Sequence, residues 1–186
     1  ILKMKIALLD DNPEQLERNQ RFLSTLPVEV VTASLTAKTF LQEVKLSKPE
    51  ILILDLNLGD SYMTGMEVAH ELKLPVLFAS SNTPEYVKEM ERLKREESLC
   101  VDHITKPFTE QEFQKTLSRF LQEVTFFSNQ SHVTLDLGKQ KRIKLAVDSI
   151  VYLAADKASG SESNNKQIYF SNRKSESLID FSFSFV

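Results

Sequence analysis

The chain has 186 residues, of which 41% are hydrophobic and 26% charged, and a formal net charge of −3. This length is enough for one large domain, or for one domain and a smaller one. The acidic balance argues against a protein that binds polyanions over its whole surface, and leaves a local basic face open. The chain has a single cysteine, Cys100, which excludes an internal disulfide and is consistent with a reducing cytosol. We interpret Cys100 as an inert, small hydrophobic residue.

No stretch approaches the roughly 18 apolar residues that a membrane-spanning helix needs. The first four residues, Ile1-Leu2-Lys3-Met4, lack the long apolar segment of a signal peptide. We therefore expect a cytoplasmic protein that has no membrane partner.

Four short segments that we expect to be strands end in polar or charged residues. These are residues 6–9 before Asp10-Asp11, residues 51–54 before Asp55, residues 75–79 before Ser80, and residues 101–105 before Lys106. Runs of this length, bounded by polar residues, are typical of inner strands of a parallel sheet. Ligands bind outside the carboxyl ends of such strands, so we expect these side chains to meet at one edge of the sheet.

Helix signals separate the expected strands. They are an N-cap and first-turn proline at Asn12-Pro13, capping boxes of Thr64 with Glu67 and Thr109 with Glu112, and apolar stripes of Ala37, Phe40, Leu41 and Val44 and of Phe113, Leu117, Phe120 and Leu121. With a further strand at residues 28–33, strands and helices alternate up to about Val124. This alternation predicts an α/β domain.

Three carboxylates at one edge, those of Asp10, Asp11 and Asp55, repel one another unless a hard divalent cation such as Mg²⁺ lies among them. Such a cation indicates phosphate chemistry. The Lys106 ammonium and the Ser80 hydroxyl would contact the remaining oxygens of a phosphoryl group that one carboxylate carries. The residues therefore predict a site that holds an aspartyl phosphate.

Asp10-Asp11, Asp55, Ser80 and Lys106-Pro107-Phe108, in this order and spacing, resemble the receiver domain of two-component response regulators. The resemblance covers about residues 3–125, and we place the receiver domain at residues 1–125. It implies a flavodoxin-like, doubly wound sheet of five parallel strands in the order 2-1-3-4-5, which agrees with right-handed crossovers.

The resemblance also implies roles for single residues. Asp55 would accept a phosphoryl group from a histidine kinase. Mg²⁺ would be held by Asp10, Asp11, Asp55 and the backbone carbonyl of Asn57, in part through water. Lys106 would bind the phosphate, Ser80 would be the switch hydroxyl, and the Lys106-Pro107 bond would be cis. His103 falls where receivers usually carry a switch aromatic; its alternative is an ordinary half-buried histidine.

Two segments differ from the common receiver pattern. Residues 58–65 lengthen the loop after Asp55, which would change access to it. Residues 83–97 are highly charged and form either a solvated helix or part of the dimer surface that receivers commonly build on helix 4, strand 5 and helix 5. Asn57 and Asn82 stand two residues beyond Asp55 and Ser80, where receivers tune the hydrolysis of the phosphoryl group.

Past Val124 the pattern changes to short strands, at residues 132–135, 142–145, 150–153 and 167–170. We therefore expect a small, mainly-β C-terminal domain at residues 126–186. Asp148, Ile150, Tyr152 and Leu153 resemble the opening of a LytTR-type DNA-binding domain, with alanine where glutamate is usual. About two thirds of such a module is present, so we expect a partial domain, and we expect the complete domain to bind DNA.

We expect residues 1–186 themselves to bind DNA poorly. The basic residues of the second domain are scattered along expected strand edges: Lys139, Lys141, Arg142, Lys144, Arg173 and Lys174. Contacts of this type give salt-sensitive affinity that does not depend on DNA sequence.

Three functions from different classes fit these observations. The first is a transcription regulator in which phosphorylation of Asp55 repositions Ser80 and pairs two chains on DNA. The second is a signalling adaptor that binds proteins and no DNA. The third is a phosphatase that resembles haloacid dehalogenases, which need Asp-x-Asp just after the first strand. Here that strand ends in Asp10-Asp11-Asn12, so we expect no enzyme.

Overall fold

The computed structural model describes residues 3–59, 62–81, 83–129, 132–136, 142–146, 150–155, 166–170 and 176–178. The chain forms two compact units, Ile1–Phe127 and Ser128–Val186. The domain boundary expected from the sequence lies two residues earlier, between residues 125 and 126.

Strands and helices alternate along the described part of the first unit. In chain order they are β1 (Met4–Leu9), α1 (Pro13–Leu23), β2 (Val28–Ser34), α2 (Ala37–Ser47), β3 (Ile51–Leu54), α3 (Gly65–Leu72), β4 (Val76–Ser80), α4 (Thr83–Glu96), β5 (Val101–Thr105) and α5 (Glu110–Ser128). The strands form one sheet in the order β2-β1-β3-β4-β5, and every neighbouring pair is parallel. The predicted strand order is therefore confirmed.

The register brings the ends of these strands to one level. Leu9 pairs with Leu54, so Asp10 and Asp55 leave two adjacent strands side by side. On the other side of β3, Ser80 pairs with Thr105, which directly precedes Lys106. The polar residues after the four strands consequently share one edge of the sheet.

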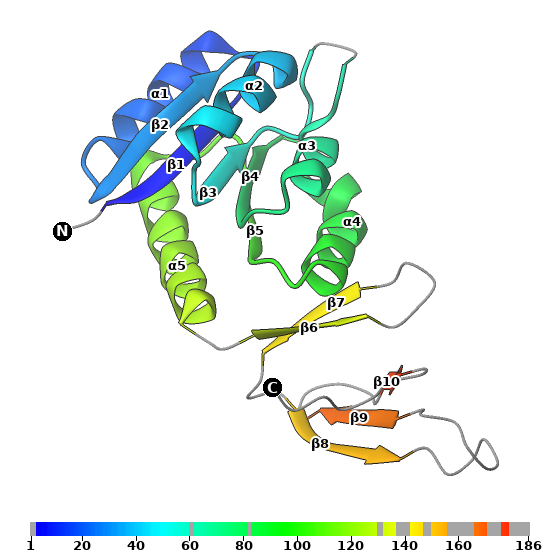
Figure 1. Ribbon diagram of the computed structural model, residues 1–186. Coiled ribbons are helices and arrows are strands. Elements are labelled where there is room, and N and C mark those ends of the chain that lie inside the picture. Colours follow the sequence, from blue (N-terminus) through cyan, green and yellow to red (C-terminus); the bar gives the residue numbers. More distant parts are fainter. Residues whose placement is uncertain are drawn as a thin grey trace. The chain divides into compact units, whose positions relative to one another are not determined.

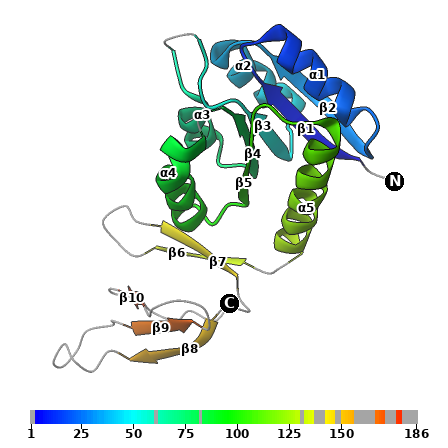
Figure 2. The ribbon, with the colours of Figure 1, turned by 180° about the vertical axis from the view of Figure 1, so that it is seen from behind.

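Helices cover both faces of the sheet, as Figure 1 and the view from behind in Figure 2 show. On one face, Phe22 of α1 and Phe113 of α5 pack in a cluster that includes Ile53. On the other face, Phe40 of α2 and Leu93 of α4 belong to a second cluster. Both clusters are apolar, because the inner strands alternate their side chains between two covered faces.

The predicted helix starts are confirmed. Asn12 Oδ1 accepts hydrogen bonds from the N–H groups of Glu14 and Gln15, with Pro13 next to it. Thr64 and Glu67 form a capping box: the side chain of each accepts the backbone N–H of the other, and the Thr64 hydroxyl also donates to the Glu67 carboxylate. Thr109 and Glu112 make the same three hydrogen bonds. These bonds satisfy N–H groups that have no partner inside the helix.

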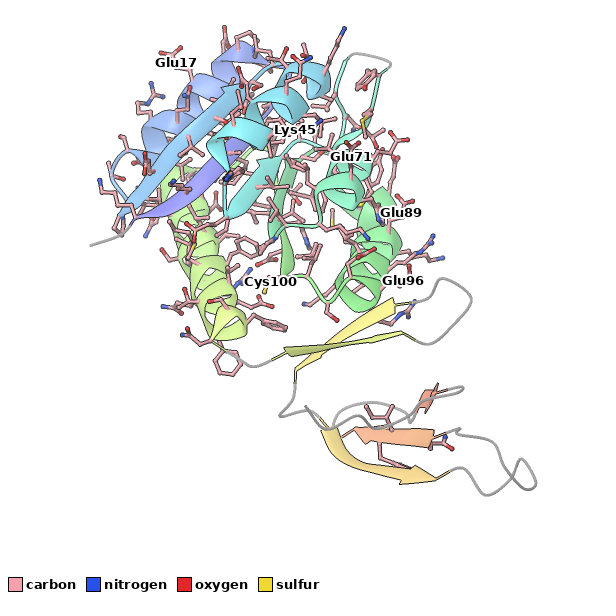
Figure 3. The ribbon with its side chains drawn as sticks, viewed as in Figure 1. Glu17, Lys45, Glu71, Glu89, Glu96 and Cys100 are labelled. Atoms are coloured by element: carbon pink, nitrogen blue, oxygen red, sulfur yellow. The ribbon has the colours of Figure 1, made fainter. Side chains whose placement is uncertain are left out.

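Charged side chains such as Glu17, Glu71 and Glu89 lie on the outer helix surfaces, whereas Cys100 is buried (Figure 3). Burial raises the pKa of the Cys100 thiol to about 12, the nearby Glu123 adds to the rise, and Lys94 opposes it. The thiol therefore stays protonated at neutral pH, in agreement with an inert hydrophobic role.

None of the helices in the described residues is long and apolar enough to cross a bilayer.

The described residues of the second unit form antiparallel strands. β6 (His132–Asp136) pairs with β7 (Arg142–Ala146), while β9 (Lys166–Phe170) lies between β8 (Ile150–Ala155) and β10 (Glu176–Leu178). Ile168 is fully buried. Several residues named from the sequence lie outside the described residues: Asn82, Lys139, Lys141, Asp148, Arg173 and Lys174.

Candidate functional site

Three carboxylates meet at the carboxyl edge of the sheet. Asp10 and Asp11 follow β1, Asp55 follows β3, and one oxygen from each lies within 4.8 Å of the others. Asp10 is buried, Asp55 is half-buried and Asp11 is exposed. The strand register is the cause, because it ends β1 and β3 at the same level.

Lys106 joins two of these carboxylates. Its Nζ donates to Asp10 Oδ2 at 2.7 Å and to Asp55 Oδ2 at 2.6 Å, and its side chain is only 13% exposed. Three ionised carboxylates and one ammonium leave a formal charge of −2 at this edge of the sheet. Such a site attracts a divalent cation.

Ser80 ends β4 next to this lysine and is fully buried. Its carbonyl accepts the Lys106 N–H at 3.1 Å, which ties the end of β4 to the start of the loop after β5. The Lys106-Pro107 bond is cis, as the resemblance implies.

Backbone N–H groups hold each carboxylate in place. The N–H of Asn12 donates to Asp10 Oδ1 at 3.0 Å, that of Asn57 to Asp55 Oδ1 at 3.2 Å, and that of Gly59 to Asp11 Oδ2 at 2.7 Å. The first two are local bonds, in which a short Asp side chain binds the backbone two residues further on, whereas the third joins Asp11 after β1 to the loop after β3. The cluster is therefore organised by its own loops.

Burial raises the pKa of Asp10 above its usual value, and the charge of Asp55 adds to the rise. The hydrogen bond and positive charge of Lys106 act in the opposite direction, as does the Asn12 N–H. Desolvation is the largest of these effects, so one lysine does not fully compensate the buried charge.

Comparisons with known proteins agree with this geometry. The family model for the response regulator receiver domain matches residues 6–118, which is more than half of the chain. The chain belongs to this family. The sensory transduction protein LytT of Bacillus cereus is 29% identical to this receiver protein over 124 residues, which cover 63% of this chain and 47% of LytT. The chain thus spans about half the length of the curated relatives it matches.

Solved structures share the receiver fold. The chemotaxis response regulator CheY4 of Vibrio cholerae is 23% identical, with a TM-score of 0.55, and the match covers 64% of this chain and 99% of that one. The receiver domain of RcsB from Salmonella enterica serovar Typhimurium, in the presence of the phosphomimetic BeF3⁻, is 22% identical with a TM-score of 0.56. That match covers 66% of this chain and 90% of the RcsB chain. At these identities the likeness shows the fold alone.

Receivers typically bind Mg²⁺ at an acidic pocket, and the aspartate cluster of this receiver suits that ion. Mg²⁺ takes oxygen ligands at about 2.1 Å in octahedral geometry, so opposite ligands lie about 4 Å apart. Carboxylate oxygens within 4.8 Å of one another need only a small closure, or a bridging water. The donor set is all oxygen, as a hard cation requires.

His103 lies away from this cluster, on an outer strand. It pairs with Phe78 in the sheet and is exposed, and it lines a shallow depression of about 140 Å³ with Val87 and Met90 of α4. The alternative of an ordinary half-buried histidine is therefore wrong, and the switch role stays a prediction. The cause is that β5 is the edge strand of the receiver sheet, so α4 covers His103 only in part.

Three residues near the receiver site were not anticipated from the sequence. A Cβ atom on Gly65 would lie 1.9 Å from the Asp55 carbonyl oxygen, so only glycine lets α3 start against the end of β3. A Cβ atom on Gly59 would lie 2.7 Å from Asp11 Oδ2. The Tyr86 hydroxyl donates to Asn57 Oδ1 at 3.1 Å. The two glycines follow the acceptor strand, and this position in the sequence could have indicated a close backbone contact there. No sequence pattern around Tyr86 indicates its contact with Asn57.

Proposed function

We propose that this receiver accepts a phosphoryl group on Asp55, with Mg²⁺ held by Asp10, Asp11, Asp55 and the backbone carbonyl of Asn57. The observation that carries the proposal is the position of Lys106, whose Nζ bonds to both Asp10 and Asp55. The Lys106 ammonium already lies against the acceptor carboxylate, so it can neutralise the charge of the oxygens that a phosphoryl group adds. When bound, Mg²⁺ supplies further neutralisation of the same charge.

The donor we propose is a sensor histidine kinase, as for other receivers. An Asp55 carboxylate oxygen forms a bond to phosphorus, and the bond from phosphorus to the donor's histidine nitrogen breaks, leaving its electron pair on that nitrogen. Asp55 is half-buried and held by Asn57 N–H, so its carboxylate keeps one orientation during the attack.

We propose that Ser80 is the switch residue of this receiver. It ends β4 and its carbonyl binds the Lys106 N–H, so it lies beside the residue that contacts Asp55. A phosphoryl group on Asp55 would draw the Ser80 hydroxyl toward its oxygens. His103 lies on the neighbouring strand β5, beside α4. It is the candidate for the second switch residue, whose side chain would move when the Ser80 hydroxyl moves.

Phosphorylation would then promote pairing of two chains through α4, β5 and α5. Val87 of α4 is 44% exposed, and the exposed His103 lies beside it. Arg119 of α5 binds Asp102 of β5 at 2.6 Å, which fixes charged side chains on these two elements. An exposed apolar side chain with charges on neighbouring elements is suited to a reversible interface.

We propose a DNA-binding output for the complete C-terminal domain, with transcription regulation as the result. Two observations support this assignment: the similarity to LytT, and the resemblance of residues 148–153 to the opening of a LytTR-type domain. We propose no enzyme activity on a separate substrate. An adaptor that binds proteins without DNA is the alternative outcome.

Intact mass spectrometry tests the acceptor proposal. Incubation with acetyl phosphate and Mg²⁺ should add one phosphoryl group, and removal of Mg²⁺ with a chelator should prevent the addition. Asp55→Asn should stay unmodified under the same conditions. An Asp55→Asn protein that gains the phosphoryl group as readily as the parent would contradict the proposal.

A further inference from the structure

A side-chain hydrogen bond joins α4 to the loop after the acceptor aspartate. The Tyr86 hydroxyl donates to Asn57 Oδ1 at 3.1 Å, although the two residues are 29 positions apart. Tyr86 is half-buried and packs on the core cluster that contains Leu56, the residue between Asp55 and Asn57. Packing holds the ring, and the ring fixes where the hydroxyl can reach.

Asn57 is bound on its other side to the acceptor. Its N–H donates to Asp55 Oδ1 at 3.2 Å, and the preceding Leu56 is fully buried, so the backbone at Asn57 is fixed beside the acceptor carboxylate. The Asn57 side chain is exposed. It is therefore a polar group beside the acceptor, and the hydrogen bond from Tyr86 fixes the direction of its Oδ1.

The direction of this amide matters because an acyl phosphate is lost to water. The oxygen of a water molecule forms a bond to phosphorus, the bond from phosphorus to the Asp55 oxygen breaks, and both protons of the water leave with the product H₂PO₄⁻. A free side-chain amide near the acceptor can hydrogen-bond that water and orient it for attack.

On the basis of the proposed function, we propose that Tyr86 is a positioning residue that lengthens the lifetime of the Asp55 acyl phosphate. Its hydroxyl holds the Asn57 side chain away from the attacking water. Because Tyr86 lies on α4, a partner or second chain that moves this helix would release Asn57 and shorten the lifetime. Loss of the phosphoryl group would then depend on what α4 contacts.

Tyr86→Phe tests this role, because it removes the hydroxyl and keeps the ring that packs on the core. The protein is phosphorylated with acetyl phosphate and Mg²⁺, the donor is removed by rapid desalting, and the phosphorylated fraction is followed by intact mass. We expect the half-life to shorten about threefold, since one partly exposed hydrogen bond shifts an equilibrium by roughly this factor. Tyr169→Phe, the same change in the second compact unit, should leave the half-life unchanged.

A double-mutant cycle separates positioning from a general structural effect. In the Asn57→Ala background, Tyr86→Phe should not change the half-life, because the tyrosine acts through the asparagine side chain. Equal half-lives for the parent and Tyr86→Phe would overturn this inference alone. A Tyr86→Phe effect that persists in the Asn57→Ala background would also overturn it. A parent that takes no phosphoryl group would overturn the proposed function together with this inference.

Discussion

The buried charge of Asp10 is the main electrostatic cost at the site. Asp10 is 3% exposed, and burial raises its pKa even though Lys106 donates to it. The unfolded chain keeps this proton only below the ordinary aspartate pKa of 3.8, whereas the folded chain keeps it to higher pH. The stability that protonated Asp10 gives is therefore full below pH 3.8 and is lost as pH rises through the folded pKa.

Asp10→Asn should consequently stabilise the metal-free protein at pH 7. The amide is neutral and its Oδ1 can still accept the Asn12 N–H. We expect the thermal midpoint to rise by on the order of 3 °C, which corresponds to about 1 kcal/mol for a protein of this size. The gain should shrink as pH is lowered toward 4. Calorimetry without metal measures it, and a lower midpoint for the variant at pH 7 would show that the Lys106 pair outweighs the burial of the charge.

The sequence correctly predicted that the three acids and the lysine are neighbours. Each follows an apolar run, and strand ends in a parallel sheet share one edge. The contact of Tyr86 with Asn57 could not be found in the same way. It depends on how α4 packs on the sheet, and no local pattern around either residue encodes that packing. The exposure of His103 was missed because it depends on which strand lies at the edge.

At the scale of elements, the start of α3 against the end of β3 fixes the acceptor loop. The Gly65 N–H donates to the Leu56 carbonyl at 3.0 Å, and the glycine lies where a Cβ atom would overlap the Asp55 carbonyl. Gly65 lies between Thr64 and Glu67, the two residues whose capping box begins α3. The sequence predicted the capping box, while the reason for glycine inside it appeared only in the packing of two elements.

Gly65→Ala should destabilise the receiver strongly, because the added Cβ would lie 1.9 Å from a backbone oxygen that cannot move aside. We expect a loss of about 3 kcal/mol in urea unfolding, the upper range for overpacking. Gly59→Ala is the matched control, since its Cβ would meet the end of the Asp11 side chain, which can rotate. Equal stability losses in both variants would show that α3 is free to shift.

For the whole molecule, we propose that phosphorylation changes how one chain meets another. Beryllofluoride with Mg²⁺ mimics the phosphoryl group, and we expect it to double the mass measured by light scattering. Ser80→Ala should weaken this association while leaving phosphorylation largely intact, because the hydroxyl links the phosphate to the α4 side. A parent whose mass does not respond to beryllofluoride would count against switching by dimerisation.

We propose a DNA-binding output only for the complete C-terminal domain. We predict that residues 1–186 bind DNA weakly and without sequence preference, because their basic residues are scattered and give only salt-sensitive contacts. Fluorescence anisotropy at physiological salt, with related and unrelated duplexes, measures this. A tight and selective complex would place the DNA-reading element within residues 126–186.

We propose that Asp55 is the residue that carries the phosphoryl group. Borohydride reduces an aspartyl phosphate to homoserine, so treatment after phosphorylation with Mg²⁺ marks the acceptor permanently, and peptide mapping finds the marked position. We predict homoserine at position 55 and unchanged aspartate at positions 10 and 11. Homoserine at position 10 or 11, or at no position in a protein whose intact mass shows a phosphoryl group, would contradict the account.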